Sequence, residues 1–173
     1  MKAVWTVAAL VAALAPGCGG GSKACLPGAG TEPVVRAADT GTAYLTAVSV
    51  AGAGCADRVA FTFSGRLPGY RVEYRTAAQA QIQDASGLHV DVAGGAFLVV
   101  RLADAQTARA HADGSIAPTY DGPRRLPATD TRHVQEVVKT GDFEAVVTWA
   151  IGLDDSRPFD VLASGRRIVV EIG

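Results

Sequence analysis

The chain has 173 residues, a formal net charge of −1 and a hydrophobic content of 49%. This length suits one folded domain with a terminal appendage, and the composition excludes a chain that is disordered throughout. The near-neutral charge excludes a general electrostatic attraction to nucleic acid, so no nucleic-acid partner is expected.

The N-terminus has the pattern of an export signal. Lys2 is followed by an uncharged run of twelve residues from Val4 to Ala15. A membrane-spanning helix needs about 20 apolar residues, so this run is too short to span a bilayer and has the length of a signal-peptide core. We therefore predict a signal peptide at residues 1–17, in preference to a buried helix of the domain.

The end of this run resembles a bacterial lipobox. It reads Ala15-Pro16-Gly17-Cys18, and lipoprotein processing would cleave before Cys18 and attach diacylglycerol to its sulfur. The expected partner is the membrane, through an N-terminal lipid anchor on the extracytoplasmic face of the bacterial cell membrane. Plain secretion is the alternative, because leucine usually stands where this chain has Ala15.

The other two of the three cysteines are expected to pair. An exported protein folds in an oxidising compartment, where Cys25 and Cys55 most simply form a disulfide, worth roughly 3 kcal/mol on the chain-entropy model. Two free thiols are the alternative. Because residues 18–43 are rich in glycine and proline, we predict a lipidated cysteine followed by a flexible tether, with the folded domain at 44–173.

Within that domain, apolar residues alternate with polar ones, as in strands with one buried and one exposed face. Clear alternation predicts strands at residues 57–63, 70–75, 88–92, 143–151 and 167–172, and weaker patterns add 45–50, 96–102, 134–139 and 159–162. Turn residues separate these segments, for example Ser64-Gly65 and Thr140-Gly141. The prediction is an all-β domain, a β-sandwich of about eight or nine mostly antiparallel short strands. Residues 103–131 are predicted to form one long irregular loop.

Several of these segments resemble a known family. They are Asp57–Phe63, Pro68–Tyr74, Gly141–Leu153, Arg157–Val161 and Arg167–Ile172, and they look like the AMIN-like domain of actinobacterial secreted proteins and lipoproteins. The resemblance covers roughly residues 44–173, with one departure at Ala150, where the family more often has glycine. It implies a β-sandwich, and through the parent AMIN domain a non-catalytic module for the cell wall or for localisation. It carries over no ligand-binding residue.

The sequence has no pattern typical of an enzyme. It contains neither a Gly-x-Ser-x-Gly elbow nor a phosphate-binding glycine loop, so no catalytic residue and no cofactor are expected. His89 and Asp91 lie on one face of a predicted strand, but two ligands without a third make a poor metal site, and no metal is expected. Asp154-Asp155 is interpreted as turn chemistry rather than as a catalytic carboxylate pair.

Two sets of side chains are candidates for binding. The aromatic residues Tyr70, Tyr74, Phe143 and Trp149 would suit a sugar, but each falls on the apolar side of its predicted strand, which favours the core. The arginines Arg71, Arg75, Arg124 and Arg125 are the preferred ligand-binding candidates, because guanidinium groups bind carboxylates and phosphates in forked geometry. A merely solvated face is the alternative for them.

Together these patterns predict a non-catalytic envelope lipoprotein. Its β-sandwich would bind cell-wall glycan or an envelope protein partner. The alternative is a carrier that holds a lipid or another apolar ligand between its sheets, which would require an internal apolar cavity with an opening.

Overall fold

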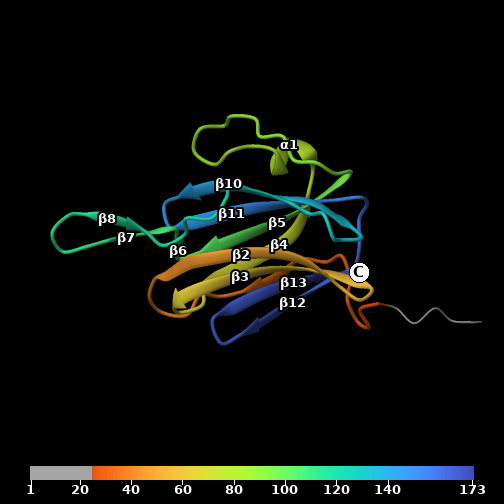
Figure 1. Ribbon diagram of the computed structural model, residues 1–173, viewed down its shortest axis with the longest axis horizontal. Helices are drawn as coiled ribbons and strands as arrows, with labels where there is room; N and C mark the ends of the chain where they lie inside the picture. Colours follow the sequence, from red (N-terminus) through yellow and green to blue (C-terminus); the bar gives the residue numbers. More distant parts are fainter. Residues whose placement is uncertain (1–24) are drawn as a thin grey trace, which may run out of the picture.

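The structure is a computed structural model that describes residues 25–173, so the predicted signal peptide and Cys18 lie outside the described residues. Two β-sheets pack face to face, and a hairpin projects from one end (Figure 1). The prediction of an all-β sandwich is confirmed. Among residues 25–173, no helix is long and apolar enough to cross a membrane.

Among residues 25–173, eight strands are six residues or longer, close to the predicted number. They are β2 (Ala43–Ala53), β3 (Ala56–Gly65), β4 (Gly69–Arg75), β5 (Ala96–Ala103), β10 (Val134–Phe143), β11 (Val146–Leu153), β12 (Phe159–Ser164) and β13 (Arg167–Ile172). Five strands have two or three residues: β1 (Val34–Arg36), β6 (Ala105–Gln106), β7 (Ala108–Ala110), β8 (Ile116–Pro118) and β9 (Arg125–Pro127). One short helix, α1 (Ala77–Ala80), follows β4.

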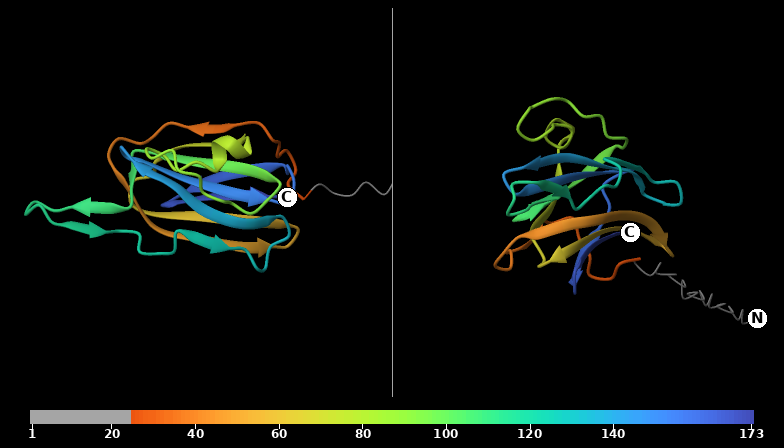
Figure 2. Two further views of the ribbon diagram at one scale, coloured as in Figure 1. Left: turned by 90° about the horizontal axis from the view of Figure 1, so that it is seen from above. Right: turned by 60° about the vertical axis from the view of Figure 1, so that its left-hand side comes forward.

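The larger sheet has the strand order β1-β4-β5-β11-β10-β9, and the smaller one has the order β12-β13-β3-β2-β6. Every pairing is antiparallel except that of β2 with β6. The right-hand view of Figure 2 shows the two sheets as separate layers, one above the other. Strands β7 and β8 pair only with each other and form the projecting hairpin (Figure 1).

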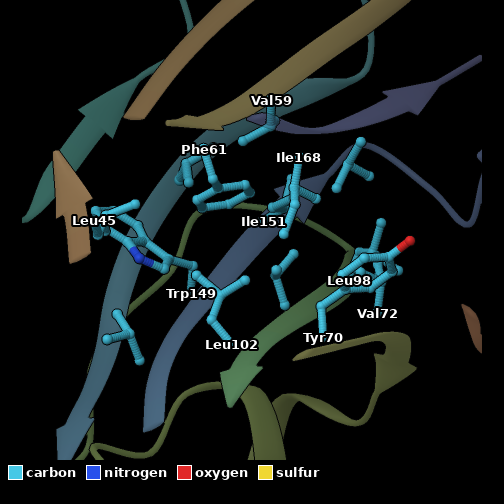
Figure 3. Close-up of a cluster of buried hydrophobic side chains, with 14 of the residues drawn as sticks. Leu45, Val59, Phe61, Tyr70, Val72, Leu98, Leu102, Trp149, Ile151 and Ile168 are labelled. Carbon is cyan, nitrogen blue, oxygen red and sulfur yellow. The ribbon is translucent and has the colours of Figure 1, made fainter. Parts of the chain in front are cut away.

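The core fills the space between the two sheets. Trp149 of β11 is fully buried and packs edge-on against Phe61 of β3, with ring centroids 6.0 Å apart (Figure 3). Tyr120, from the segment between β8 and β9, packs edge-on against the same indole at 5.7 Å. Aliphatic side chains from both sheets complete the cluster, including Leu45, Val59, Val72, Leu98, Leu102, Ile151 and Ile168. Apolar burial of this extent is the main stabilising contribution to the fold.

The predicted strand at 143–151 is wrong, because it contains a hairpin turn. Strand β10 ends at Phe143 and β11 begins at Val146. Glu144 and Ala145 lie between them with φ of 49° and 59°, the left-handed conformation of a type I′ turn. The predicted turn at Thr140-Gly141 instead lies inside β10, at an irregularity in its pairing with β11.

Two other predictions for irregular segments also need correction. Residues 88–92 form no strand of either sheet, and His89 makes only an isolated bridge with Ile82. Residues 103–131 are not one irregular loop, because β6, β7, β8 and β9 lie within them. Each of these strands has only two or three residues, too few for an alternating pattern to be recognised in the sequence.

The N-terminal segment is more ordered than the predicted tether. The predicted disulfide is confirmed, since Cys25 and Cys55 are bonded. Gly30 bridges to Phe159 of the smaller sheet, and β1 then pairs along β4 of the larger sheet. Residues 25–36 therefore contact both layers of the sandwich before the first long strand begins.

A loop covers part of the outer face of the larger sheet. It runs from α1 to β5, and its Ala80 and Val92 are buried against Phe97, Val99, Val138 and Ala150 in a second apolar cluster. The side chain of Gln81 fixes the loop by donating a hydrogen bond to the Val92 carbonyl, with a distance of 3.0 Å.

Candidate binding groove on the outer face of the six-stranded sheet

The uncovered part of this outer face carries a row of charged and polar side chains. Alternation along β4 places Tyr70 and Val72 in the core and sends Arg71, Glu73 and Arg75 outward. In the neighbouring strand β5, Arg101 lies opposite Arg71. In β11, Thr148 lies opposite Arg101 at the boundary of the covered part, where it is buried and contacts Asp84 of the covering loop.

Glu73 holds two of these arginines in place. Its side chain is only 9% exposed, and Arg71 donates to it with a distance of 2.7 Å between the charged atoms. Arg75 contacts the other carboxylate oxygen. The hydrogen bond from Arg71 holds the pKa of Glu73 below its ordinary value against the opposing effect of burial, and the same bond raises the pKa of Arg71. Both guanidinium groups are thereby oriented, although their outer edges stay exposed.

These arginines border a groove of about 370 Å³. Its other lining residues are mostly small or apolar: Val35, Ala37, Ala38, Gly69, Ala103 and Val146, with Arg36, Tyr70, Arg101 and Asp104. One wall is the segment after β1, which crosses so near β4 that a β-carbon at Gly69 would lie 2.7 Å from the Ala38 nitrogen. Glycine is thus required at this crossing.

Arg101 is a candidate that the sequence interpretation missed. Among residues 25–173 it takes part in no ion pair, unlike Arg71, Arg75 and Arg36, the last of which pairs with Asp39 at 3.0 Å. Phe97, Val99 and Arg101 occupy alternate positions of β5, so strand periodicity places all three side chains on the outer face. This periodicity could have identified Arg101 from the sequence as an outward-facing arginine. Only the strand pairing reveals that Arg101 lies beside Arg71.

The other predicted pair, Arg124 and Arg125, lies elsewhere. Arg125 belongs to β9 and pairs with Glu136 at 2.5 Å, while it also donates to the Asp91 carbonyl at 2.8 Å. Arg124 donates to the Lys139 carbonyl at 3.0 Å and borders a separate hollow of about 240 Å³. Strands β5, β11 and β10 separate β4 from β9, so the structure does not bring the four arginines together.

The four aromatic candidates do not assemble into a sugar platform. Trp149 and Tyr70 are buried in the core, as the sequence favours. Tyr74 is half-buried, and its hydroxyl donates to the Arg157 carbonyl at 2.7 Å, while burial raises its pKa. Phe143 is 53% exposed at the hairpin turn, so its predicted core position is wrong.

The remaining titratable candidates take part in contacts within loops and turns. His89 and Asp91 contact each other at 2.9 Å on an exposed loop. No group of three or more His, Cys, Asp or Glu side chains suited to a metal ion occurs within the part of the chain that the structure describes. Asp154 follows β11 and binds Arg157 through both carboxylate oxygens, while the Asp155 carboxylate accepts from the Ser156 nitrogen, consistent with a turn.

The space between the sheets is filled, which argues against the lipid-carrier alternative. The side chains of Leu45, Leu102, Trp149 and Ile151 there are fully buried. The groove and the hollows around it lie on the outer surface of the sheet. The described structure is therefore a closed sandwich with surface sites.

These features define an all-β domain with a groove on its surface, and the comparison with known families assigns the domain to one of them. The family model of the AMIN-like domain matches residues 43–173, so the chain belongs to the AMIN-like domain family and the predicted resemblance is confirmed. No curated protein and no solved structure gives a significant match. Family membership indicates an extracytoplasmic role at the cell envelope, and domains of this family are generally non-catalytic binding domains.

Proposed function

We propose that this protein is a lipid-anchored envelope lipoprotein whose groove binds the cell wall. The family supports the envelope setting. The sequence around Cys18 supports the lipid anchor, and the glycine-rich residues after it would let the domain reach away from the membrane surface.

The observation that carries the wall-binding proposal is the charge balance of the groove. Four arginines, Arg36, Arg71, Arg75 and Arg101, line the groove, and Asp104 is the carboxylate in its lining. Glu73 pairs with Arg71 and Arg75, and Asp39 pairs with Arg36, so four cationic groups face three carboxylates and one positive charge is uncompensated. Each guanidinium has five N–H donors, and only some are used by Glu73. Wall peptides and anionic wall polymers carry carboxylate or phosphate groups that such donors bind in forked geometry.

Co-sedimentation with purified cell-wall sacculi tests this proposal. The mature chain would carry Cys18→Ser so that it is soluble, and binding would be measured over a salt series. We expect saturable binding that weakens with salt, because the groove residues are exposed to screening. Arg101→Gln should reduce binding, whereas Arg166→Gln should not, since Arg166 lies in the turn between β12 and β13 of the other sheet. Absence of binding at low salt would overturn the proposal.

The lipid anchor has its own test. Mass spectrometry of the protein purified from membranes should find a mature N-terminus at Cys18 with diacylglycerol on its sulfur. Cys18→Ser should release the protein from the membrane fraction. A mature chain that begins elsewhere, or an unmodified Cys18, would overturn the anchor and leave the secreted alternative.

A further inference from the structure

A second, smaller hollow adjoins the groove, and its lining combines the carboxylate of Asp84 with two of the groove's arginines. It measures about 120 Å³ and shares Arg75 and Arg101 with the groove. Its remaining lining is Gln79, Asp84, Val99 and Thr148. The guanidinium groups of Arg75 and Arg101 therefore stand between a cationic groove on one side and a carboxylate on the other.

Asp84 is held rigidly at this place. Its backbone N–H donates to the Thr140 carbonyl at 3.0 Å, which fixes the covering loop to β10. The hydroxyl of Thr148 donates to the Oδ2 atom of Asp84 at 2.6 Å, which orients the carboxylate over β11. Within residues 25–173, Asp84 takes part in no ion pair. Arg75 and Arg101 line the same hollow but form no ion pair with Asp84, so this partly buried carboxylate is still able to accept a hydrogen bond from a ligand amine.

We propose that the groove and this hollow together bind an amino acid residue of a wall peptide that carries both a free carboxylate and a free amine. The inference rests on the proposed wall binding and names the part of the wall that is bound. Arg101, with Arg71 beside it, binds the carboxylate, and Asp84 binds the amine. The small and apolar side chains of Ala103 and Val146 line the groove next to the carboxylate position.

The strand geometry sets the separation of the two ligand groups. Arg101 and Thr148 are direct partners on adjacent strands, and such residues have Cβ atoms about 5 Å apart. Asp84 lies one hydrogen bond beyond Thr148. The carboxylate and the amine are thus expected roughly 5–10 Å apart, a distance that a diamino acid side chain or a short peptide spans.

The same charges disfavour the other wall components. A neutral glycan would leave both Arg101 and Asp84 without an ionic partner. A uniformly anionic polymer would bring a negative group near Asp84, and like charges in a partly buried site repel each other. The mixed charge of the two hollows therefore favours the peptide part of the wall.

Chemically blocked sacculi test the inference. The probes are native sacculi, sacculi with amines acetylated, and sacculi with carboxylates amidated. We expect amine acetylation to weaken binding of the Cys18→Ser chain about tenfold, the size expected for one lost hydrogen bond between charged groups, and carboxylate amidation to weaken it at least as much. Acetylation increases the net negative charge of the wall, so a site that responds only to negative charge would instead bind acetylated sacculi more tightly.

Matched variants test whether this loss of sacculus binding depends on Asp84 and Arg101. Asp84→Asn keeps the shape and the acceptor for Thr148 but removes the charge, and it should bind native and acetylated sacculi equally. Arg101→Gln should respond little to carboxylate amidation, and Arg166→Gln should behave as the unaltered chain. Thermal unfolding of each variant checks that the fold is intact.

The possible failures are distinguishable. Unchanged or tighter binding to acetylated sacculi would overturn the inference and leave the proposed wall binding in place. Equal sensitivity of Asp84→Asn and the unaltered chain to acetylation would overturn the role of Asp84. Loss of binding to every preparation, native sacculi included, would overturn both the inference and the proposed function.

Discussion

Asp57, at the start of β3, connects the two sheets through its carboxylate. The side chain is fully buried and accepts hydrogen bonds from three consecutive backbone N–H groups, those of Arg132, His133 and Val134, at 2.7–3.0 Å. These residues lead into β10 of the opposite sheet. We predict that Asp57→Ala lowers the free energy of unfolding by about 3 kcal/mol, because three backbone donors, of which that of Val134 is buried, lose a charged acceptor. Urea denaturation measures the change.

Asp57→Asn is the control for this prediction. The amide keeps the shape and one acceptor oxygen, but its NH₂ group faces backbone donors, so an intermediate loss is expected. If Asp57→Ala were within 0.5 kcal/mol (roughly the effect of a neutral surface substitution) of the unaltered protein, the carboxylate would not be needed to hold the entry to β10.

Asp154 gives the protein a contribution to stability that depends on pH. The hydrogen bond from Arg157 chiefly lowers the pKa of Asp154 to about 2, against the effect of burial and with smaller help from His133. The folded pKa lies below the unfolded value, so this stability is present above about pH 4 and is lost as the pH falls through 2. We predict a contribution of about 1 kcal/mol after allowance for solvent screening at this partly exposed site.

The measurement is urea denaturation of the unaltered protein and of Asp154→Asn. The variant should be less stable at pH 6, and the difference should shrink towards zero near pH 2 because protonation removes the same interaction in the unaltered chain. A difference that stays constant between pH 6 and pH 2 would show that the carboxylate charge does not stabilise this turn.

At the residue scale, the sequence predicts only part of the candidate site. Alternation along 70–75 correctly sends Arg71 and Arg75 outward. It cannot bring Arg101 and Asp84 to them, since those contacts depend on the order of strands and on a loop folding back over the sheet. Hydrogen bonds between residues 64 apart, such as Thr148 with Asp84, have no local signal in the sequence.

At the element scale, the β10–β11 hairpin turn contains two residues that are unfavourable in the backbone conformation that the turn requires. Glu144 and Ala145 both have positive φ, a conformation in which Asn and Gly are preferred and side chains with a β-carbon are strained. We predict that replacing the pair by Asn-Gly raises the free energy of unfolding by about 1 kcal/mol. Thermal and urea unfolding would measure the increase.

The turn between β12 and β13 supplies a control in which the free energy of unfolding should fall instead of rise. Gly165 has a φ of 58°, and a β-carbon there would meet no atom within 4 Å. Gly165→Ala should therefore destabilise the protein by about 1 kcal/mol through backbone strain alone. A neutral result for both changes would show that these turns relax at little cost.

The same turns explain which elements the sequence predicts. Strands β3, β4 and β13 match their predictions closely because polar and apolar residues alternate regularly along each of them. The β10–β11 turn has no glycine or asparagine, so the alternation in the sequence continues through it, and Phe143 is misplaced as a result. Strand β1 is missed because three residues in a proline-rich segment carry no alternation, and only pairing with β4 makes them a strand.

For the whole molecule, the N-terminal segment holds the two layers and one wall of the groove together. The disulfide joins Cys25 to Cys55, which lies between β2 and β3, and β1 then pairs with β4 in the other sheet. Residues 35–38, which are the end of β1 and the two residues after it, line the groove. These residues precede the family match at 43–173, so this wall lies outside the part of the chain that the family model covers.

We therefore predict that the double variant Cys25→Ser/Cys55→Ser loses both stability and wall binding. The bridged residues are 30 apart, so the loss in free energy of unfolding should be about 3 kcal/mol on the chain-entropy model. Sacculus binding should weaken as well, because β1 is only three residues long and its pairing alone is a weak hold on the groove wall. Urea denaturation and co-sedimentation, each compared with the unaltered chain under non-reducing conditions, measure the two effects. Normal binding by a variant that is clearly destabilised would show that the disulfide holds the sandwich together without shaping the groove, and the wall at 35–38 would then depend on its contacts with Gly69 and β4.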